Sequence, residues 1–225
     1  MDYDELEFYV SQPRLNRFLR ACNNSKLKTQ KLYKINLQAA QAFYPLMSLF
    51  ETFFRNALNY RLSQYFNDPD WIINQKYGFM SDPSLGSSYF LKSCIENAEN
   101  NIRRDRRAVT SSKILAEQTL GFWTTFFDNH HYILTHGTAL GAFPKKPLNI
   151  NRSQMAKKLK RIRDFRNRIY HNEPICFNEQ AVDFSIAFEV ENDIHEIMEW
   201  INPNLKNYTN YFNTISAVID KINEL

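Results

Sequence analysis

The fold is decided by the stretch Leu159-Lys-Arg-Ile-Arg-Asp-Phe-Arg-Asn-Arg-Ile-Tyr-His-Asn-Glu-Pro174. Its apolar residues recur at steps of three and four, which is the spacing of one face of an α-helix. These residues are Leu159, Ile162, Phe165 and Ile169. Pro174 ends the helix, because the residue before a proline resists the α conformation. His171 is therefore expected in the last helical turn or just past it.

Three polar residues near the end of this helix form a candidate site for a phosphate group. Asn167 and His171 are four residues apart, so their side chains share one helix face. Arg166 lies five residues before His171, which corresponds to about 140° around the helix axis. Its long side chain must curl, or the last turn must loosen, for both residues to reach one ligand. A guanidinium would then hold phosphate oxygens, and an imidazole would transfer protons.

Residues 166–175 resemble the signature of the bacterial Abi-like (abortive infection) proteins, which belong to the HEPN superfamily of helical domains. Two other segments resemble motifs of the same family. One is the segment 51–58, Glu-Thr-Phe-Phe-Arg-Asn-Ala-Leu, and the other is the Gly-Phe-Trp segment 120–127, which is followed by Phe143-Pro144. The chain departs from the family at Asn172, where many relatives have a second histidine.

Sequence and resemblance together predict an all-α fold, with a single HEPN-like domain over residues 1–225. The expected architecture is a helical bundle with additional helices and a loop-rich insertion around 67–88. Its expected parts are N-terminal helices in 11–66, the motif helix in 151–173 and C-terminal helices in 178–225. The resemblance implies a metal-independent endoribonuclease that acts as a toxin-like effector in phage defence. It also implies a homodimer, because HEPN nucleases typically place two motifs face to face.

Several residues around the motif are expected to support the site. They are Glu51, Arg55, Asn56, Arg168 and Glu173. Glu51 and Arg55 are four residues apart on a strongly apolar helix, so they can form an ion pair. Two interpretations of that pair stay open. It is either an internal ion pair that positions neighbouring helices, or a support for the catalytic residues.

The net charge of +4 conceals a strongly basic segment. Between residues 145 and 168 there are ten Lys and Arg and one acid, and a second cluster follows residue 102. One basic face on an otherwise acidic body is typical of a protein that binds a polyanion such as RNA. The alternative is an ordinary solvated helix face. The expected RNA-binding residues are Lys145, Lys146, Arg152, Lys157, Lys158, Lys160, Arg161, Arg163, Arg103 and Arg104.

The composition argues against several classes of protein. No apolar run approaches the roughly 20 residues that cross a bilayer, and the acidic start is not a secretory signal. We therefore expect a cytoplasmic protein without a membrane partner. The three cysteines lack the spacing of a metal site and are interpreted as free thiols, so neither a metal nor a cofactor is expected.

The apolar spacing also predicts the other helices. One should begin at Ser11, and a long one should run from about 28 to 66, kinked or split at Pro45. Others are expected at about 88–107, from 111 onward, at about 178–200 and at about 205–225. Trp71, Ile72 and Ile73 should pin the loop 67–88 to the core, and the alternative is that this loop forms a partner surface. The aromatic residues of 114–127 are expected in the core rather than on a base-stacking surface. Short strands in 67–88 or 140–150 stay open.

Three functions fit these features. In the first, the 2′-hydroxyl of RNA attacks the neighbouring phosphate, His171 acts as base or acid, Arg166 holds the phosphate and Asn167 orients one of them. The motif has a single histidine per chain, which is too few for both proton transfers, so a dimer would supply the second histidine. The other two are a non-catalytic RNA-binding or toxin–antitoxin module and a domain that works with a nucleotidyltransferase. The expected partners are RNA, as substrate or as a cognate non-coding RNA, an antitoxin and a second copy of the chain.

Overall fold

A computed structural model describes residues 1–86 and 89–224. The described chain is mostly helical, and its strands form a single two-stranded hairpin, which confirms the all-α class. The chain divides into two compact units, which are described separately. The first unit contains Met1–Leu49, Asp164–His195 and Asn207–Leu225, and the second contains Phe50–Arg163 and Glu196–Lys206. Whether the two units act as a single HEPN-like domain stays a prediction. None of the described helices combines the length and the apolar character needed to cross a membrane.

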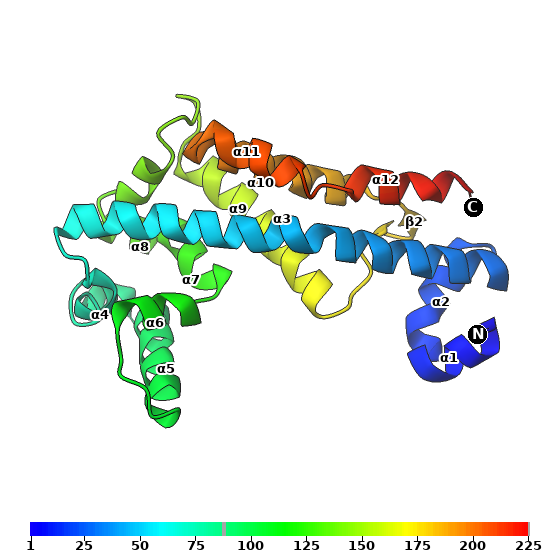
Figure 1. The fold of residues 1–225 in the computed structure, drawn as a ribbon, viewed down its shortest axis with the longest axis horizontal. Helices are drawn as coiled ribbons and strands as arrows, with labels where there is room; N and C mark the ends of the chain where they lie inside the picture. The colour runs from blue at the N-terminus through cyan, green and yellow to red at the C-terminus, as the bar shows by residue number, and fades with distance from the viewer. Residues whose placement is uncertain (87–88, 225) are drawn as a thin grey trace. The chain divides into compact units, whose positions relative to one another are not determined.

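The longest element is α3, Lys26–Phe66, drawn from blue to cyan in Figure 1. Pro45 lies inside this helix and does not split it. A proline inside a helix removes one backbone hydrogen bond and costs about 3 kcal/mol. Phe43 before the proline and Leu46 and Met47 after it are deeply buried. Burial of such side chains contributes about 1.5–3 kcal/mol each, which is enough to keep the helix continuous.

The first unit is built around the N-terminal part of α3. It begins with α1, Tyr3–Val10, which was not predicted, and α2, Gln12–Ala21. The unit also contains the end of α9, Arg152–Tyr170, and the start of α10, Ser185–Ile201. Phe43 of α3 packs edge-on against Phe165 of α9, with ring centroids 4.8 Å apart. Phe18 of α2 likewise packs against Phe177, with ring centroids 5.0 Å apart.

The predicted helix from about residue 178 is wrong at its start. The chain instead forms β1, Phe177–Asn178, and β2, Ala181–Val182, which pair antiparallel. Arg17 explains the hairpin, because its guanidinium donates to the carbonyl of Glu179 in the turn and lies 4.3 Å from the ring centroid of Phe177. The helix begins only at Ser185, whose backbone N–H donates to Asp183. Hydrogen bonds from Ser185 lower the pKa of that carboxyl.

The predicted C-terminal helix of residues 205–225 is also wrong as a single element. The chain forms α11, Pro203–Asn210, then α12, Ile215–Ile219, and a 3₁₀ turn, η5, Asp220–Glu224. Asn213 accounts for the interruption, because its side chain accepts a hydrogen bond from the backbone N–H of Ile215. Asparagine competes with helix in this way, by bonding the nearby backbone. α12 lies beside the N-terminal part of α3 (Figure 1).

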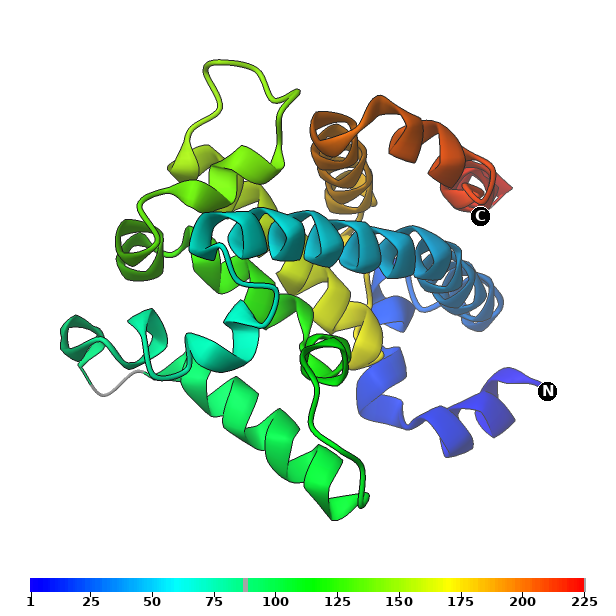
Figure 2. The same ribbon diagram turned by 60° about the vertical axis from the view of Figure 1, so that its left-hand side comes forward.

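The second unit contains the C-terminal part of α3 and a series of short helices. These are α4 (Trp71–Asn74), η1 (Phe79–Ser81), η2 (Pro83–Leu85), α5 (Phe90–Arg104), α6 (Ser111–Glu117), α7 (Leu120–Thr124), η3 (Thr125–Phe127), α8 (Asn129–Leu134) and η4 (Thr138–Ala142). α5 lies beside η1, α6 and α7 (Figure 2). The N-terminal part of α9 and the segment Glu196–Lys206 complete the unit.

Aromatic residues fill the core of the second unit. Phe54 of α3 stacks with Phe127 and Phe143, and Trp71 meets Trp123 edge-on at 6.4 Å. This confirms that the aromatic block 114–127 belongs to the core. Trp71 is fully buried, as predicted, so the segment 67–86 is fixed to the unit and carries short helices rather than loop alone. The predicted start of the next helix, Ser88, lies outside the described residues.

Candidate functional site

The end of α9 is closed by a Schellman motif, a C-terminal cap that contains one left-handed residue. Asn172 is that residue, with a φ of 55°. Its N–H donates to the carbonyl of Ile169 at 3.0 Å, and the N–H of Glu173 donates to that of Arg168 at 2.8 Å. These two bonds define the motif, in which asparagine is an accepted alternative to glycine. The backbone around His171 is therefore fixed by hydrogen bonds rather than left as an open loop.

Asn167 and His171 both lie on the exposed side of α9. The backbone N–H of His171 donates to the carbonyl of Asn167 at 2.9 Å, so the last turn remains regular up to the histidine. Their side chains consequently share one face, and both residues are exposed. Asp164 lies on the same exposed face one turn earlier, and sequence reasoning gave it no role.

Arg166 reaches along the helix rather than away from it. Its guanidinium carbon lies 3.9 Å from the centroid of the Tyr170 ring, one helical turn further on. The last turn does not loosen, so a common ligand for Arg166 and His171 would require the arginine side chain to curl, which stays a prediction. Arg168 and Glu173 are two of the predicted supporting residues, and they form an ion pair across the cap. Nε of Arg168 lies 3.8 Å from Oε2 of Glu173. This exposed ion pair adds at most about 1 kcal/mol to the stability of the cap.

One residue that holds this helix end was missed from the sequence. Asn36 of α3 is only 4% exposed, and its side-chain oxygen accepts the backbone N–H of Ile175 at 2.8 Å. A buried amide that satisfies a buried backbone donor is costly to remove. Together with the Phe43–Phe165 contact, it fixes the chain after Pro174 to α3. The available signal was a polar residue on the apolar face of α3, between Ile35 and Ala39.

The predicted supporting residues Glu51, Arg55 and Asn56 belong to the second unit. Glu51 and Arg55 are half-buried and Asn56 is exposed. The Arg55 guanidinium donates to the Asn56 side chain at 3.3 Å. One turn further along α3, the side-chain oxygen of Asn59 accepts a hydrogen bond from the indole N–H of Trp71 at 2.9 Å, which links the helix to α4. A role for these residues in catalysis stays a prediction.

Several of the predicted RNA-binding residues on α9 are engaged within the second unit. The Arg152 guanidinium donates to the carbonyl of Phe127 at 2.8 Å, and that of Arg163 donates to Thr124 at 3.1 Å. Lys158 pairs with Glu196 at 2.7 Å. These contacts join α9 to α7, η3 and α10, so part of the basic run is structural. Of the rest, Lys145, Lys157 and Lys160 are exposed and Lys146 and Arg161 are half-exposed.

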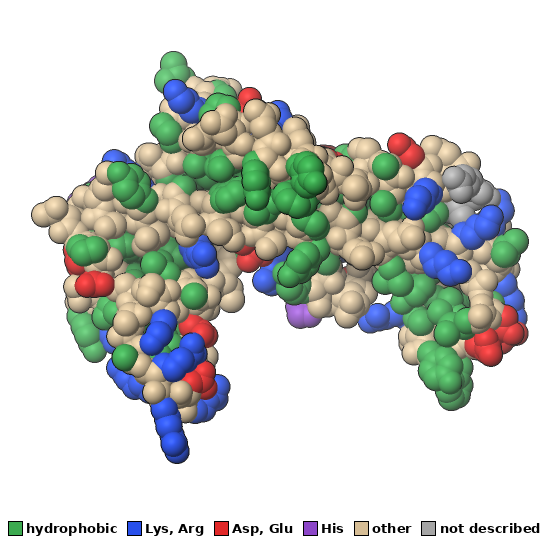
Figure 3. Space-filling model, viewed as in Figure 1, with side chains coloured by type: hydrophobic (Ala, Val, Ile, Leu, Met, Phe, Trp, Pro, Cys, Tyr) green, Lys and Arg blue, Asp and Glu red, His purple; other side chains and the backbone are tan. Residues whose placement is uncertain are grey.

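The second predicted cationic cluster lies at the end of α5. Arg103 and Arg104 are exposed there, and Figure 3 shows blue side chains gathered over this end. Arg103 pairs with the buried Glu99 at 3.3 Å, and Arg107 pairs with Asp105 at 2.8 Å. Cations near a helix C-terminus are favoured without any ligand. The cluster therefore fits either an RNA contact or a helix end.

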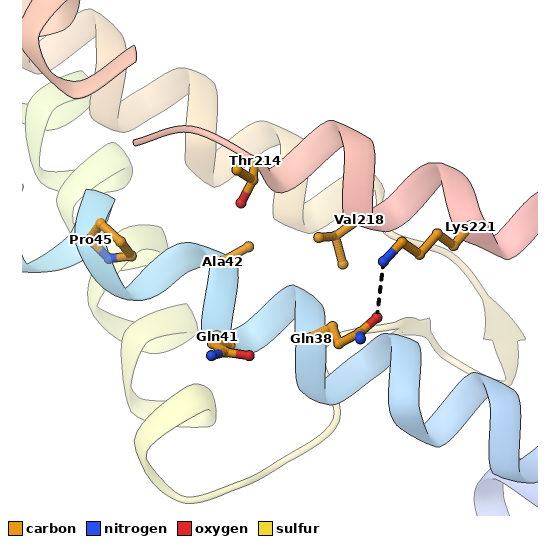
Figure 4. Close-up of a pocket in the computed structure, with 7 residues that line it drawn as sticks. All are labelled: Gln38, Gln41, Ala42, Pro45, Thr214, Val218 and Lys221. Carbon is orange, nitrogen blue, oxygen red and sulfur yellow. Dashed lines mark hydrogen bonds between the residues drawn. The ribbon is translucent and has the colours of Figure 1, made fainter. Parts of the chain in front are cut away.

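Each unit also has a pocket. In the first unit, a cavity of about 340 Å³ lies between α3 and α12 (Figure 4). It is lined by Gln38, Gln41, Ala42, Pro45, Thr214, Val218 and Lys221. In the second, a cavity of about 620 Å³ includes Lys145 and Lys158 in its lining, together with Trp200 and two glutamates. Arg166, Asn167 and His171 do not line either of these two cavities, and Asn167 and His171 are exposed at the end of α9.

We compared the chain with models of known protein families, with curated proteins and with solved structures, and none of the three comparisons gave a match.

Proposed function

We propose that this chain is a metal-independent endoribonuclease of the HEPN type. The observation that carries the proposal is the end of α9, where an exposed His171 and an exposed Asn167 share one face and the guanidinium of Arg166 lies against Tyr170, the residue before the histidine. An exposed imidazole on a fixed backbone suits proton transfer to a polymer. The resemblance of the three motifs to Abi-like proteins adds the proposed role, a toxin-like effector in phage defence.

The proposed reaction uses the RNA 2′-hydroxyl as nucleophile. The oxygen attacks the adjacent phosphorus, the bond to the 5′ oxygen of the next nucleotide breaks, and the products carry a 2′,3′-cyclic phosphate and a 5′-hydroxyl. The proton leaves the 2′-hydroxyl, and the leaving oxygen gains one. His171 performs one of these transfers, and His171 of a second copy performs the other. Arg166 offsets the charge that develops on the phosphate, and Asn167 orients the imidazole or the hydroxyl.

The test compares two exposed histidines. His171→Ala should abolish cleavage of RNA in a buffer with EDTA, and it should also remove toxicity in cells that express the protein. His130→Ala is the matched control, because His130 is also exposed and belongs to the second unit. It should cleave like the wild type. The products should carry 2′,3′-cyclic phosphate ends.

Loss of function must be separated from loss of folding and of binding. His171→Ala should keep the circular dichroism spectrum and the RNA affinity of the wild type. Equal cleavage by His171→Ala and wild type would refute the proposal. RNA binding without any cleavage by the wild type would favour the second function, a non-catalytic RNA-binding module.

A further inference from the structure

Tyr170 is a large aromatic residue beside the candidate site without a role in the proposed reaction. It is the last residue of α9 and directly precedes His171. Its side chain is 51% exposed, whereas the aromatic residues of the core are fully buried. An exposed ring at this place gains little from packing within the chain, so packing alone does not account for a large aromatic residue here.

One side of the Tyr170 ring is already occupied. The guanidinium carbon of Arg166 lies 3.9 Å from the ring centroid, which places the cation against one face. Tyr170 is 51% exposed with the guanidinium in this position, so part of its surface is accessible to a ligand. A cation over one face also limits the rotation of the ring, because the contact is lost when the ring turns away.

The backbone beneath the ring is fixed as well. The cap bonds at Asn172 and Glu173 hold the end of the helix, and Asn36 holds the chain two residues later through Ile175. A rigid aromatic residue loses little conformational entropy when a second flat group stacks on it. The partly exposed ring of Tyr170 is therefore suited to stack on a planar ligand, and it is adjacent in sequence to the proposed catalytic histidine.

We propose that the exposed ring of Tyr170, on the side away from Arg166, stacks on an unpaired base of the RNA substrate beside the phosphate that is cleaved. Bases stack on exposed aromatic side chains without strong sequence preference, and only bases outside a duplex are free to do so. The proposal rests on the ribonuclease function proposed above and narrows its substrate to single-stranded RNA. Arg166 would then contact the phosphate and the tyrosine together.

The first experiment measures binding apart from cleavage. His171→Ala protein is titrated into labelled oligouridine, labelled oligoadenosine and a blunt-ended RNA duplex, with fluorescence anisotropy as the signal. Both single strands should bind more tightly than the duplex. Adding Tyr170→Ala should weaken single-strand binding about 5- to 150-fold, the range expected for loss of one stacked base. Tyr170→Phe should bind like the parent, because stacking needs the ring and not the hydroxyl.

The matched control is Tyr60→Ala, since Tyr60 is another exposed helical tyrosine and lies in the second unit. It should leave binding unchanged. Equal affinity of Tyr170→Ala and its parent, with cleavage intact in the wild type, overturns the stacking proposal and leaves the nuclease. Tyrosine-dependent binding without cleavage by the wild type supports stacking and removes the nuclease. A change of oligomeric state on size-exclusion chromatography, without a change of RNA affinity, would show that the ring contacts protein and would overturn the proposal.

Discussion

Replacing Glu99 by glutamine should remove the charge that compensates a buried ammonium. The Nζ atom of Lys76 lies 2.7 Å from Oε1 of Glu99, and each side chain is only 7% exposed. Lys76 follows α4 and Glu99 lies within α5, so the pair joins two segments of the second unit. With glutamine the shape is kept, but the ammonium loses its counter-charge away from water.

The cost of this change can be bounded from the structure. Removing one partner of a buried ion pair destabilises a protein by about 3–5 kcal/mol. Arg103 also contacts Glu99, at 3.3 Å, but it is 59% exposed, so that contact adds less than about 1 kcal/mol. Glutamine can still accept a hydrogen bond, which places the expected loss near 3 kcal/mol. For a slope of about 2 kcal/mol per molar urea, the unfolding midpoint should fall by about 1.5 M.

The assay is urea unfolding followed by circular dichroism, with Glu96→Gln as control. Glu96 is exposed on the same helix, so its change should stay within about 0.5 kcal/mol. A second test uses pH. Burial alone lowers the pKa of Lys76, but hydrogen bonds to Glu99 and Tyr77 raise it above its ordinary value overall. The pair should therefore stabilise the fold fully below about pH 10.4, and the gain should vanish as pH rises through the raised pKa.

Similar urea midpoints for Glu99→Gln and Glu96→Gln would refute the reasoning. The double variant Lys76→Met with Glu99→Leu should recover most of the loss, because an apolar pair leaves no buried charge. Failure of this recovery, with a large loss in Glu99→Gln, would show that the segment needs the specific hydrogen bonds rather than charge balance.

Three other changes test the helix end and the thiols. Asn172→Ala should cost about 1 kcal/mol by thermal unfolding, because alanine disfavours the left-handed φ, whereas Asn172→Gly should be nearly neutral; equal losses would contradict the cap. Asn36→Ala should cost about 1–3 kcal/mol, since the buried N–H of Ile175 loses its acceptor; an unchanged urea midpoint would contradict this. Burial raises the pKa of Cys176 to about 12 and raises that of Cys94 as well. At pH 8.5 the half-exposed Cys94 should therefore react with iodoacetamide before Cys176, and equal labelling rates would contradict the burial of Cys176. The free energy of unfolding should fall as pH rises from about 8.5, because the thiol ionises there in the unfolded chain but stays protonated in the fold.

The helices could be predicted where apolar spacing and a stop residue agree. At the start of α9, Asn151 and Gln154 exchange hydrogen bonds in the pattern of a capping box. The end of the same helix follows from Pro174, two residues beyond the left-handed Asn172. In both places the deciding interactions lie within a few residues of each other in sequence, so they are visible without the fold.

The hairpin of β1 and β2 could not be predicted, because the interactions that decide it lie far apart in the sequence. Its turn has Glu179 at a φ of 52°, without the glycine or asparagine that marks such turns in sequence. Arg17 fixes it from more than 150 residues away, through the carbonyl of Glu179 and the ring of Phe177. A long-range contact of this kind overrides local preference, and a single sequence gives no sign of it.

The candidate site combines both situations. The shared face of Asn167 and His171 follows from helix geometry, while the anchor at Asn36 and the position of the Arg166 guanidinium over Tyr170 depend on tertiary contacts and rotamers. Asn172 belongs to the part of the site that local sequence determines. Its left-handed backbone is a conformation that asparagine adopts more readily than most residues, and this conformation closes the helix. Asn172 supplies no imidazole at this helix end, and for this reason the proposed mechanism assigns the second proton transfer to His171 of a second copy of the chain.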